Sequence, residues 1–331
     1  MKIKIVIFSI VFLIGISSSR GQVIKEEKEE KLGSAVRLLN NLASSYKLRA
    51  RVNLIYGYDT NPRLSSIRKG DSFEEFIYSL SLRKKLGKST FFGYYDFDLV
   101  NYSEFTDLSN YLNHLRLGAD RRFGKVHLGI GIDYTYLWYP HYREGDFFFL
   151  KKFLYIRQRI SRRLRYEISY ENGAKNYQHN KSLGDTIGVY QDKKRRDERN
   201  TFALKFGYRV MPRLYLRWKN YFSLNDSNAR YVDYYDYKSY RTSLGCNYKL
   251  SSRWFMLWDF TYQRKNYSSR TVTLRSYSQR DNLYITTIEL IYKLNPHSRL
   301  YTYYTYRQNS SNDAYEEYSD SIMGIGIRYQ F

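Results

Sequence analysis

Acidic and imidazole side chains occupy matching positions in three neighbouring segments that we predict to be β-strands. The predicted hairpin register places Asp98 opposite His114 and Asp96 opposite Arg116, and it brings His114 close to Asp133. Opposed residues on paired strands have Cβ atoms about 4.5–5.5 Å apart, so Asp98, His114 and Asp133 are predicted to form a carboxylate–imidazole–carboxylate cluster. Because histidine titrates near physiological pH, such a cluster is a candidate for acid–base catalysis.

A structural explanation competes with this catalytic one, because the same residues can form a polar network that only holds the wall rigid. No serine or other nucleophile is paired with His114 in the predicted register. We therefore predict no enzyme activity and keep a hydrolase centred on His114 as the alternative. The remaining histidines show no metal-ligand spacing, and we predict neither a metal nor a cofactor: His127, His141, His179 and His297.

A second set of charged residues shares one parity on three later segments. Its members are basic: Lys205, Arg209, Arg217, Lys219 and Arg241. The acidic residues of the first set are Asp96, Asp98, Asp120 and Asp133. In a ring of about fourteen strands these two sets lie across from one another. Charged walls set selectivity in pores, so the basic wall predicts attraction of anionic solutes. The alternative is that the opposite charges pair and close the lumen.

Period-2 alternation positions all of these residues. Segment 125–139 is the clearest, since its apolar residues Val126 to Trp138 lie at every second position. Successive strand side chains point to opposite faces, so one face is apolar and the other polar. In 147–160, Lys152 and Gln158 interrupt the apolar face, which leaves its parity open. The predicted strands are 46–58, 73–86, 90–102, 109–123, 125–139, 147–160, 164–176, 200–210, 214–225, 237–250, 254–267, 281–294, 299–308 and 318–331.

The connections between these segments alternate between tight and long. Tight ones fall near residues 87, 124, 161, 211, 251 and 295, and the longest of the others is 177–199. Short turns at one end and long loops at the other are the arrangement of transmembrane barrels. The composition agrees, because 38 Tyr and 19 Phe accompany a mean hydropathy of only −0.64. We predict an all-β, antiparallel, up-and-down barrel of about fourteen strands over 46–331.

The last ten residues form an amphipathic strand that ends on an aromatic residue. Met323, Ile325, Ile327, Tyr329 and Phe331 share one face. This segment resembles the terminal strand of Gram-negative outer-membrane β-barrel proteins. The resemblance implies an outer-membrane location. It also implies that Phe331 and Tyr329 are a signal for the barrel-assembly machinery.

A second resemblance is carried by Tyr56-Gly57-Tyr58-Asp59-Thr60-Asn61-Pro62. A Gly-Tyr-Asp-(Ser/Thr)-Asn run after the first strand is similar to "putative β-barrel porin" families and to the barrel half of surface-lipoprotein assembly modifiers. No helical-repeat domain precedes the barrel, which separates this chain from the assembly modifiers. The same residues also suit an Asx-type turn before the proline.

The amino-terminal region carries the pattern of a secretory signal. Lys2 and Lys4 precede an apolar run, and small residues follow it up to residue 21. Residues 22–45 are predicted to be a periplasmic segment with a short amphipathic helix. The single cysteine, Cys246, excludes an intramolecular disulfide, and its flanks suggest a small apolar filler.

The formal net charge of +23 indicates which classes of binding partner to expect. The basic residues are scattered over period-2 strands, and the secretory signal excludes nucleic acid. The expected partners are outer-membrane lipids, lipopolysaccharide near Lys193-Lys194-Arg195-Arg196, and anionic solutes. The predicted function is therefore a porin-like channel for small hydrophilic, anionic solutes or an acidic polysaccharide. A closed structural or adhesion barrel is the remaining alternative.

Overall fold

The computed structural model describes residues 47–65, 68–184, 189–229, 233–273 and 275–331. The predicted secretory signal and the periplasmic segment lie outside these residues. Three 3₁₀ turns accompany the strands: η1 (Thr106–Leu108), η2 (Arg143–Gly145) and η3 (Ala314–Glu316). The strands are β1 (Lys47–Asp59), β2 (Asp71–Leu86), β3 (Ser89–Tyr102), β4 (Asn110–Phe123), β5 (Val126–Trp138), β6 (Phe147–Arg159), β7 (Leu164–Leu183), β8 (Tyr190–Met211), β9 (Leu214–Ser227), β10 (Tyr237–Lys249), β11 (Trp254–Thr271), β12 (Ser278–Lys293), β13 (Ser298–Ser311) and β14 (Tyr318–Gln330).

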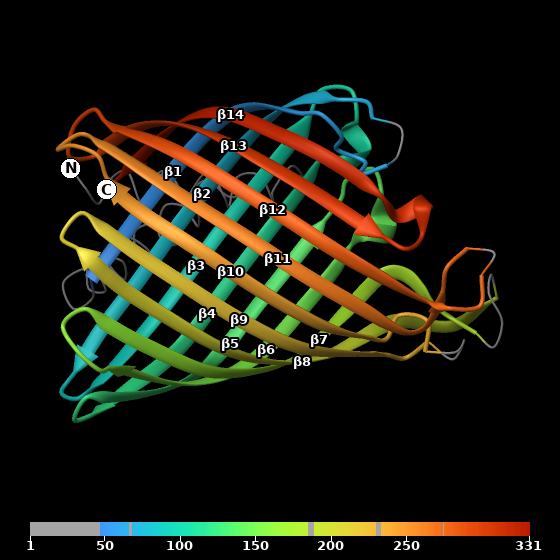
Figure 1. The fold of residues 1–331 in the computed structure, drawn as a ribbon, viewed down its shortest axis with the longest axis horizontal. Coiled ribbons are helices and arrows are strands. Elements are labelled where there is room, and N and C mark those ends of the chain that lie inside the picture. Colours follow the sequence, from blue (N-terminus) through green and yellow to red (C-terminus); the bar gives the residue numbers. More distant parts are fainter. Residues whose placement is uncertain (1–46, 66–67, 185–188, 230–232, 274) are drawn as a thin grey trace, which may run out of the picture.

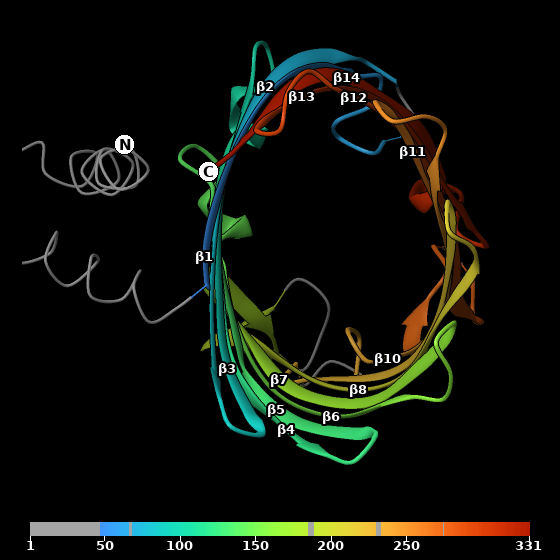
Figure 2. The same ribbon diagram turned by 90° about the vertical axis from the view of Figure 1, so that its left-hand side faces the viewer.

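These strands form one closed antiparallel barrel. Each strand pairs with the next along the chain, and β1 pairs with β14 to complete the ring. The closing register runs from Arg51 opposite Gln330 to Asp59 opposite Ile322. Viewed from the end, the ribbon traces a continuous oval (Figure 2). The predicted fold, an up-and-down barrel of fourteen strands, is confirmed.

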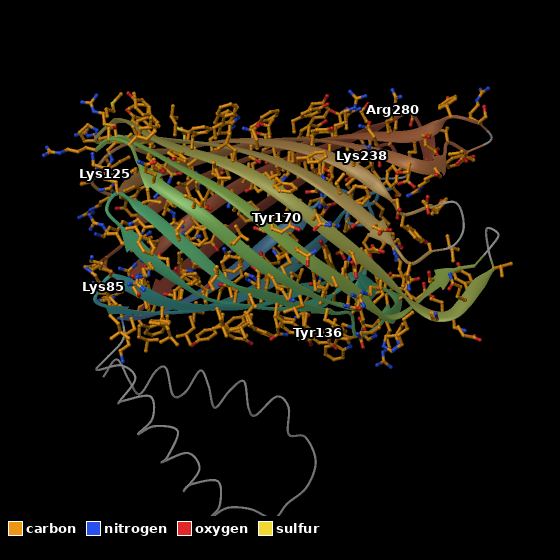
Figure 3. The ribbon with its side chains drawn as sticks, turned by 90° about the horizontal axis from the view of Figure 1, so that it is seen from below. Lys85, Lys125, Tyr136, Tyr170, Lys238 and Arg280 are labelled. Atoms are coloured by element: carbon orange, nitrogen blue, oxygen red, sulfur yellow. The ribbon has the colours of Figure 1, made fainter. Side chains whose placement is uncertain are left out.

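The outer surface carries an apolar belt. Ile130 is 67% exposed, and Leu54, Leu154 and Ile325 are each about half exposed on outward-facing positions. Exposed Lys85 and Lys125 lie toward one end, Lys238 and Arg280 toward the other, and tyrosines lie between (Figure 3). Such a belt suits lipid, because transmembrane barrels present an apolar band that faces the hydrocarbon. No helix among the described residues is long and apolar enough to cross a membrane.

The two ends of the barrel differ in their connections. At one end, turns of only two to four residues join the strands, and Gly87 and Gly124 both adopt a φ of 58° there. L-residues avoid this left-handed conformation, so glycine suits these two tight turns. The carboxy-terminus lies at the same end, and the longer connections lie at the other (Figure 1). We call these the short-turn end and the long-loop end.

The prediction of a long loop at 177–199 is wrong. The strands β7 and β8 continue to Leu183 and from Tyr190, so the segment 193–196 lies in a strand. Within this extension Arg195 forms an ion pair with Asp197, on the same strand, at 2.7 Å, and it packs on the rings of Tyr177 and Tyr235. This polar segment thus continues the strand, with the charge of Arg195 paired along β8 and its guanidinium packed on the ring of Tyr177 in β7.

The open question about β6 is also answered. Its pairing with β5 and β7 contains no register shift, so no bulge changes the parity. Lys152 consequently shares the outward face with Leu150 and Leu154. The inward face carries Lys151 instead, which contacts Asp133.

The residues after β1 close the seam between the first and last strands. The backbone N–H of Asn61 donates to the Asp59 carboxylate at 2.9 Å, which confirms the Asx-type turn. The side-chain amide of Asn61 also donates to the Ser319 carbonyl, and the Thr60 hydroxyl donates to Asp320. At the other end of the seam, the backbone N–H of Phe331 donates to the Ala50 carbonyl.

Inside the barrel, aromatic rings lie over glycines of neighbouring strands. A Cβ on Gly131 would collide with the Leu117 carbonyl and the ring of Phe153, and one on Gly326 would lie 2.8 Å from Tyr301. The rings can lie against the wall because glycine leaves the space that a side chain would fill. Directly paired examples are Gly57 with Phe73, Gly118 with Phe92, Gly129 with Tyr155, Gly131 with Phe153, Gly324 with Tyr303 and Gly326 with Tyr301.

Candidate functional site: the charged lumen

The acidic cluster exists, but its register differs from the predicted one. Asp96, not Asp98, lies opposite His114, and Arg116 lies between Tyr94 and Asp133. The β3–β4 pairing is therefore shifted by two residues. In the connection between the strands, the Ser109 hydroxyl accepts a hydrogen bond from the Tyr102 N–H ahead of β4.

The prediction that His114 lies close to Asp133 is confirmed. The Nε2 of His114 is 3.1 Å from Asp133 Oδ2, and its Nδ1 is 3.6 Å from Asp96 Oδ2. Both ring nitrogens therefore face carboxylates. A general base needs one unprotonated nitrogen within reach of the proton that it removes. The arrangement suits an imidazolium held between two acids, and it does not present a basic nitrogen to a nucleophile.

Asp133 is the centre of this network. Its side chain is only 4% exposed, and it also contacts Lys151 at 3.2 Å and Arg116 at 3.6 Å. Sequence reasoning missed Lys151, because the parity of β6 was open. The signal was present in the alternation of the flanking residues Leu150, Lys152 and Leu154.

The other two predicted acidic residues have separate partners. Asp98 lies one diagonal step from Glu75, on β2, and is not part of the histidine cluster. Asp120 lies 3.5 Å from His127 and accepts a hydrogen bond from the Tyr155 hydroxyl. In the part of the chain that the structure describes, no group of three or more candidate ligands is arranged to hold a metal ion.

The basic wall is brought together as predicted over β8 to β10. Lys205 lies directly opposite Lys219, and Arg241 lies opposite Tyr221, one diagonal step from Lys219. Two of its members pair with acids locally, although Glu167, the partner of Lys205, also pairs with Arg157. Lys205 forms an ion pair with Glu167 at 2.9 Å, and Arg217 forms one with Asp259 at 3.0 Å.

The remaining members keep their charge uncompensated. Among the described residues, no carboxylate lies within ion-pairing distance of Lys219, Arg241 or Arg209. Of these three residues, Arg209 lies nearest the short-turn end of the barrel, close to the turn that follows β8. No ion pair of the described chain joins the acidic strands β3–β5 to the basic strands β8–β10. The two walls therefore do not close the lumen by pairing across it.

Two further features of the lumen were not anticipated. One is Arg199, which lies at the level of Lys151 on the inward face of β8. The other is an apolar cluster on the opposite side, built on Ile55, Phe73, Ile291 and Tyr301. Its members sit on inward-facing positions, where the expected pattern was polar. Strand alternation alone does not separate an apolar lumen patch from an outward one.

Comparisons with known proteins agree with this geometry. The segment 235–331, which covers β10 to β14, matches the family described as "Putative beta-barrel porin 2". Comparison with curated protein sequences gives no match.

The whole barrel resembles solved outer-membrane structures. The outer membrane channel DcaP of Acinetobacter baumannii gives a TM-score of 0.53 at 11% identity over 86% of this chain and 97% of that one. OmpT of Vibrio cholerae gives 0.52 at 11% identity, with 87% and 98% covered. An anion-selective porin from Comamonas acidovorans gives 0.50 at 10% identity, with 87% and 99% covered. At these identities the likeness concerns the fold, which is that of outer-membrane porins and channels.

Proposed function

We propose that the protein is an outer-membrane channel that passes small hydrophilic solutes and prefers anions. The observation that carries the proposal is the pair of lumen cations, Lys219 and Arg241, that have no carboxylate partner among the described residues. Uncompensated charge on a pore wall favours ions of opposite sign. The acidic residues, by contrast, are engaged with neighbours on their own side of the barrel.

The width of the barrel supports a passage for solutes. A strand spacing of about 4.8 Å and a tilt of about 40° give a barrel of this strand number a backbone diameter of roughly 28 Å. Side chains fill part of that width. The aromatic rings that lie on Gly131 and Gly326 stay near the wall.

The test is single-channel recording in a planar bilayer, with a tenfold KCl gradient to read the reversal potential. We expect stable conductance steps and an anion preference. Replacing Lys219 and Arg241 by Glu should reverse that preference. Lys238→Glu is the matched control, because Lys238 lies on the same strand as Arg241 but faces outward. Cation preference in the unchanged protein would overturn the proposal.

The alternatives have distinct signatures. A correctly folded barrel that shows no conductance would be a closed structural or adhesion barrel. A hydrolase centred on His114 would lose its activity in His114→Ala, whereas a channel would keep nearly full conductance. Passage of an acidic polysaccharide is a related form of the channel, and it would appear as long, polymer-dependent blockades of the current.

Partners of the outer surface follow from the same arrangement. We propose that outer-membrane lipids cover the apolar belt and that lipopolysaccharide phosphates contact Lys194 and Arg196. Both are exposed, Arg196 also forms an ion pair with the exposed Glu198 at 2.6 Å, and Arg195 between them is engaged with Asp197. We also propose that Phe331 and Tyr329 bind the barrel-assembly machinery. Loss of lipopolysaccharide binding in Lys194→Gln/Arg196→Gln, with normal binding in Arg143→Gln, would support the lipid contact.

A further inference from the structure

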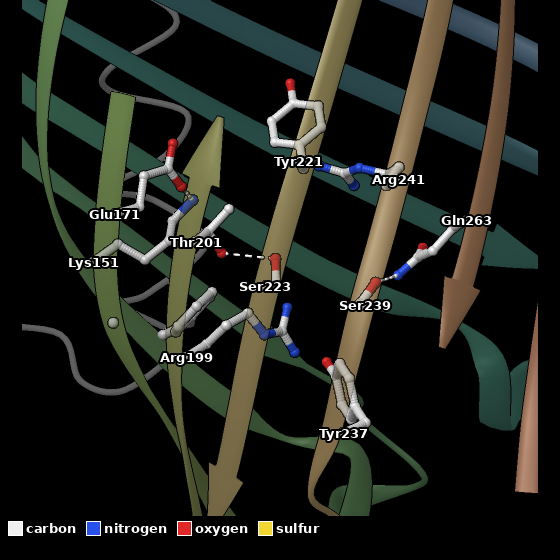
Figure 4. Close-up of a pocket in the computed structure, with 12 residues that line it drawn as sticks. Lys151, Glu171, Arg199, Thr201, Tyr221, Ser223, Tyr237, Ser239, Arg241 and Gln263 are labelled. Atoms are coloured by element: carbon white, nitrogen blue, oxygen red, sulfur yellow. Dashed lines mark hydrogen bonds and ion pairs between the residues drawn. The ribbon is translucent and has the colours of Figure 1, made fainter. Parts of the chain in front are cut away.

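A cavity of about 220 Å³ opens on the lumen side of β6 to β11. All of its twelve lining residues lie on inward-facing positions, and they include charged, hydroxyl and aromatic side chains (Figure 4). Its volume equals that of about seven liquid waters. This is room for one small ligand of about the size of a sugar ring with its substituents.

Two guanidinium groups project into this cavity without an acidic partner. Within the described chain, no carboxylate lies at ion-pairing distance from Arg199 or Arg241. The guanidinium of Arg241 lies 4.2 Å from the ring centre of Tyr221, and the Nε of Arg199 donates to the Asn225 amide oxygen at 3.3 Å. These contacts hold the guanidinium groups in place but leave their charge available. A planar guanidinium is suited to binding a carboxylate through two parallel hydrogen bonds.

The only carboxylate of the cavity lining is already neutralised. Glu171 lies 3.8 Å from Lys151, which also contacts Asp133. The net charge of the cavity is therefore positive, and an anionic group is the ligand that its electrostatics favour.

A row of hydroxyl groups crosses the floor of the cavity. Thr201, Ser223 and Ser239 are directly opposed on β8, β9 and β10, at intervals of about 4.8 Å. The Thr201 and Ser223 hydroxyls are 2.9 Å apart, and Ser239 accepts a hydrogen bond from the Gln263 amide at 2.8 Å. Each hydroxyl keeps further donor or acceptor capacity. A simple inorganic anion or an aromatic acid has no set of hydroxyl groups that could form hydrogen bonds with all members of this row.

We propose that this cavity binds an acidic sugar, namely a pyranose ring that carries a carboxylate. The carboxylate lies toward Arg199 and Arg241, the ring hydroxyls exchange hydrogen bonds with Thr201, Ser223 and Ser239, and Tyr221 and Tyr237 bound the site. The inference deepens the proposed function, because it assigns a substrate class to the same anion-attracting wall. The cavity would then be an intermediate binding site for the substrate on its path through the channel.

The experiment uses galacturonate as the probe, with galactose and benzoate as comparisons. Galacturonate added to the bilayer is expected to block chloride current at least tenfold more effectively than either comparison compound. Arg199→Gln/Arg241→Gln should raise the half-blocking concentration at least tenfold. Ser223→Ala should weaken the block by galacturonate several-fold and leave the weak block by benzoate unchanged. Lys238→Gln, on the outer face, is the control and should change neither.

Equal block by galacturonate and benzoate, or an unchanged block in the double arginine variant, would overturn the proposal. Calorimetric titration of the folded, detergent-solubilised barrel with galacturonate separates this failure from a failure of the channel itself. A barrel that conducts no ions but binds galacturonate through Arg199 refutes the channel and keeps the site. A conducting barrel that shows no such binding keeps the channel and refutes the site.

Discussion

Neutralising Asp133 tests whether the histidine cluster is a structural network. The side chain of Asp133 is 4% exposed and contacts His114 at 3.1 Å and Lys151 at 3.2 Å. Breaking a buried ion pair costs about 3–5 kcal/mol. Because the two cationic partners are 28% and 24% exposed to lumen water, part of that cost is recovered. We therefore expect Asp133→Asn to lower the free energy of unfolding by about 2–3 kcal/mol.

The assay is urea unfolding of the barrel in lipid vesicles, followed by tryptophan fluorescence and by heat-modifiable migration. Asp96→Asn is the control. Its side chain is 38% exposed and lies 3.6 Å from the same histidine, so we expect a loss below about 1 kcal/mol. If Asp133→Asn loses no more stability than Asp96→Asn, Asp133 is not the centre of the network and the reasoning from burial is wrong. A loss of conductance without a loss of stability would contradict it as well.

Three further predictions concern other parts of the barrel. Gly326→Ala should displace the ring of Tyr301 into the lumen, because the new Cβ would lie 2.8 Å from that ring. The substitution should lower the conductance, and it should lower the free energy of unfolding by about 1–3 kcal/mol. Unchanged conductance would show that the aromatic rings do not bound the pore. Lys152→Leu should raise the free energy of unfolding by about 1–3 kcal/mol, because a charged side chain on the lipid-facing surface is destabilising. A lower free energy of unfolding for this variant in urea titration would contradict the prediction. Burial and the neighbouring acids Asp226 and Asp233 raise the pKa of Asp236 to about 6. The folded-state pKa lies above the ordinary value of about 3.9, so the folded connection between β9 and β10 favours the protonated Asp236 carboxyl. This stabilisation is complete below a pH of about 3.9 and is lost as pH rises through 6. Once each rate is divided by the protease's own rate on a short peptide at the same pH, chymotrypsin should therefore cut the connection between β9 and β10 more slowly at pH 5 than at pH 7.5. This difference should disappear in Asp236→Asn, and its persistence there would assign it to another group.

The sequence by itself determined the elements and their faces. Alternation with a period of two identifies each strand, though not the full length of β7 and β8, and turn residues such as Gly87 and Gly124 mark where hairpins reverse. The same alternation separates the outward Leu and Ile residues from the inward charges. These signals are local, so no knowledge of the rest of the fold was needed to predict an antiparallel barrel of this strand number.

Tertiary structure alone decided the register and the contacts inside the lumen. A shift of a hairpin by two residues leaves every side chain on its original face, so alternation cannot tell Asp96 from Asp98 as the partner of His114. Pairing of the neighbouring strands β8, β9 and β10 then brought together Arg199, Ser223 and Arg241. Their convergence depends on register across several strands at once, and no local pattern in the sequence encodes it.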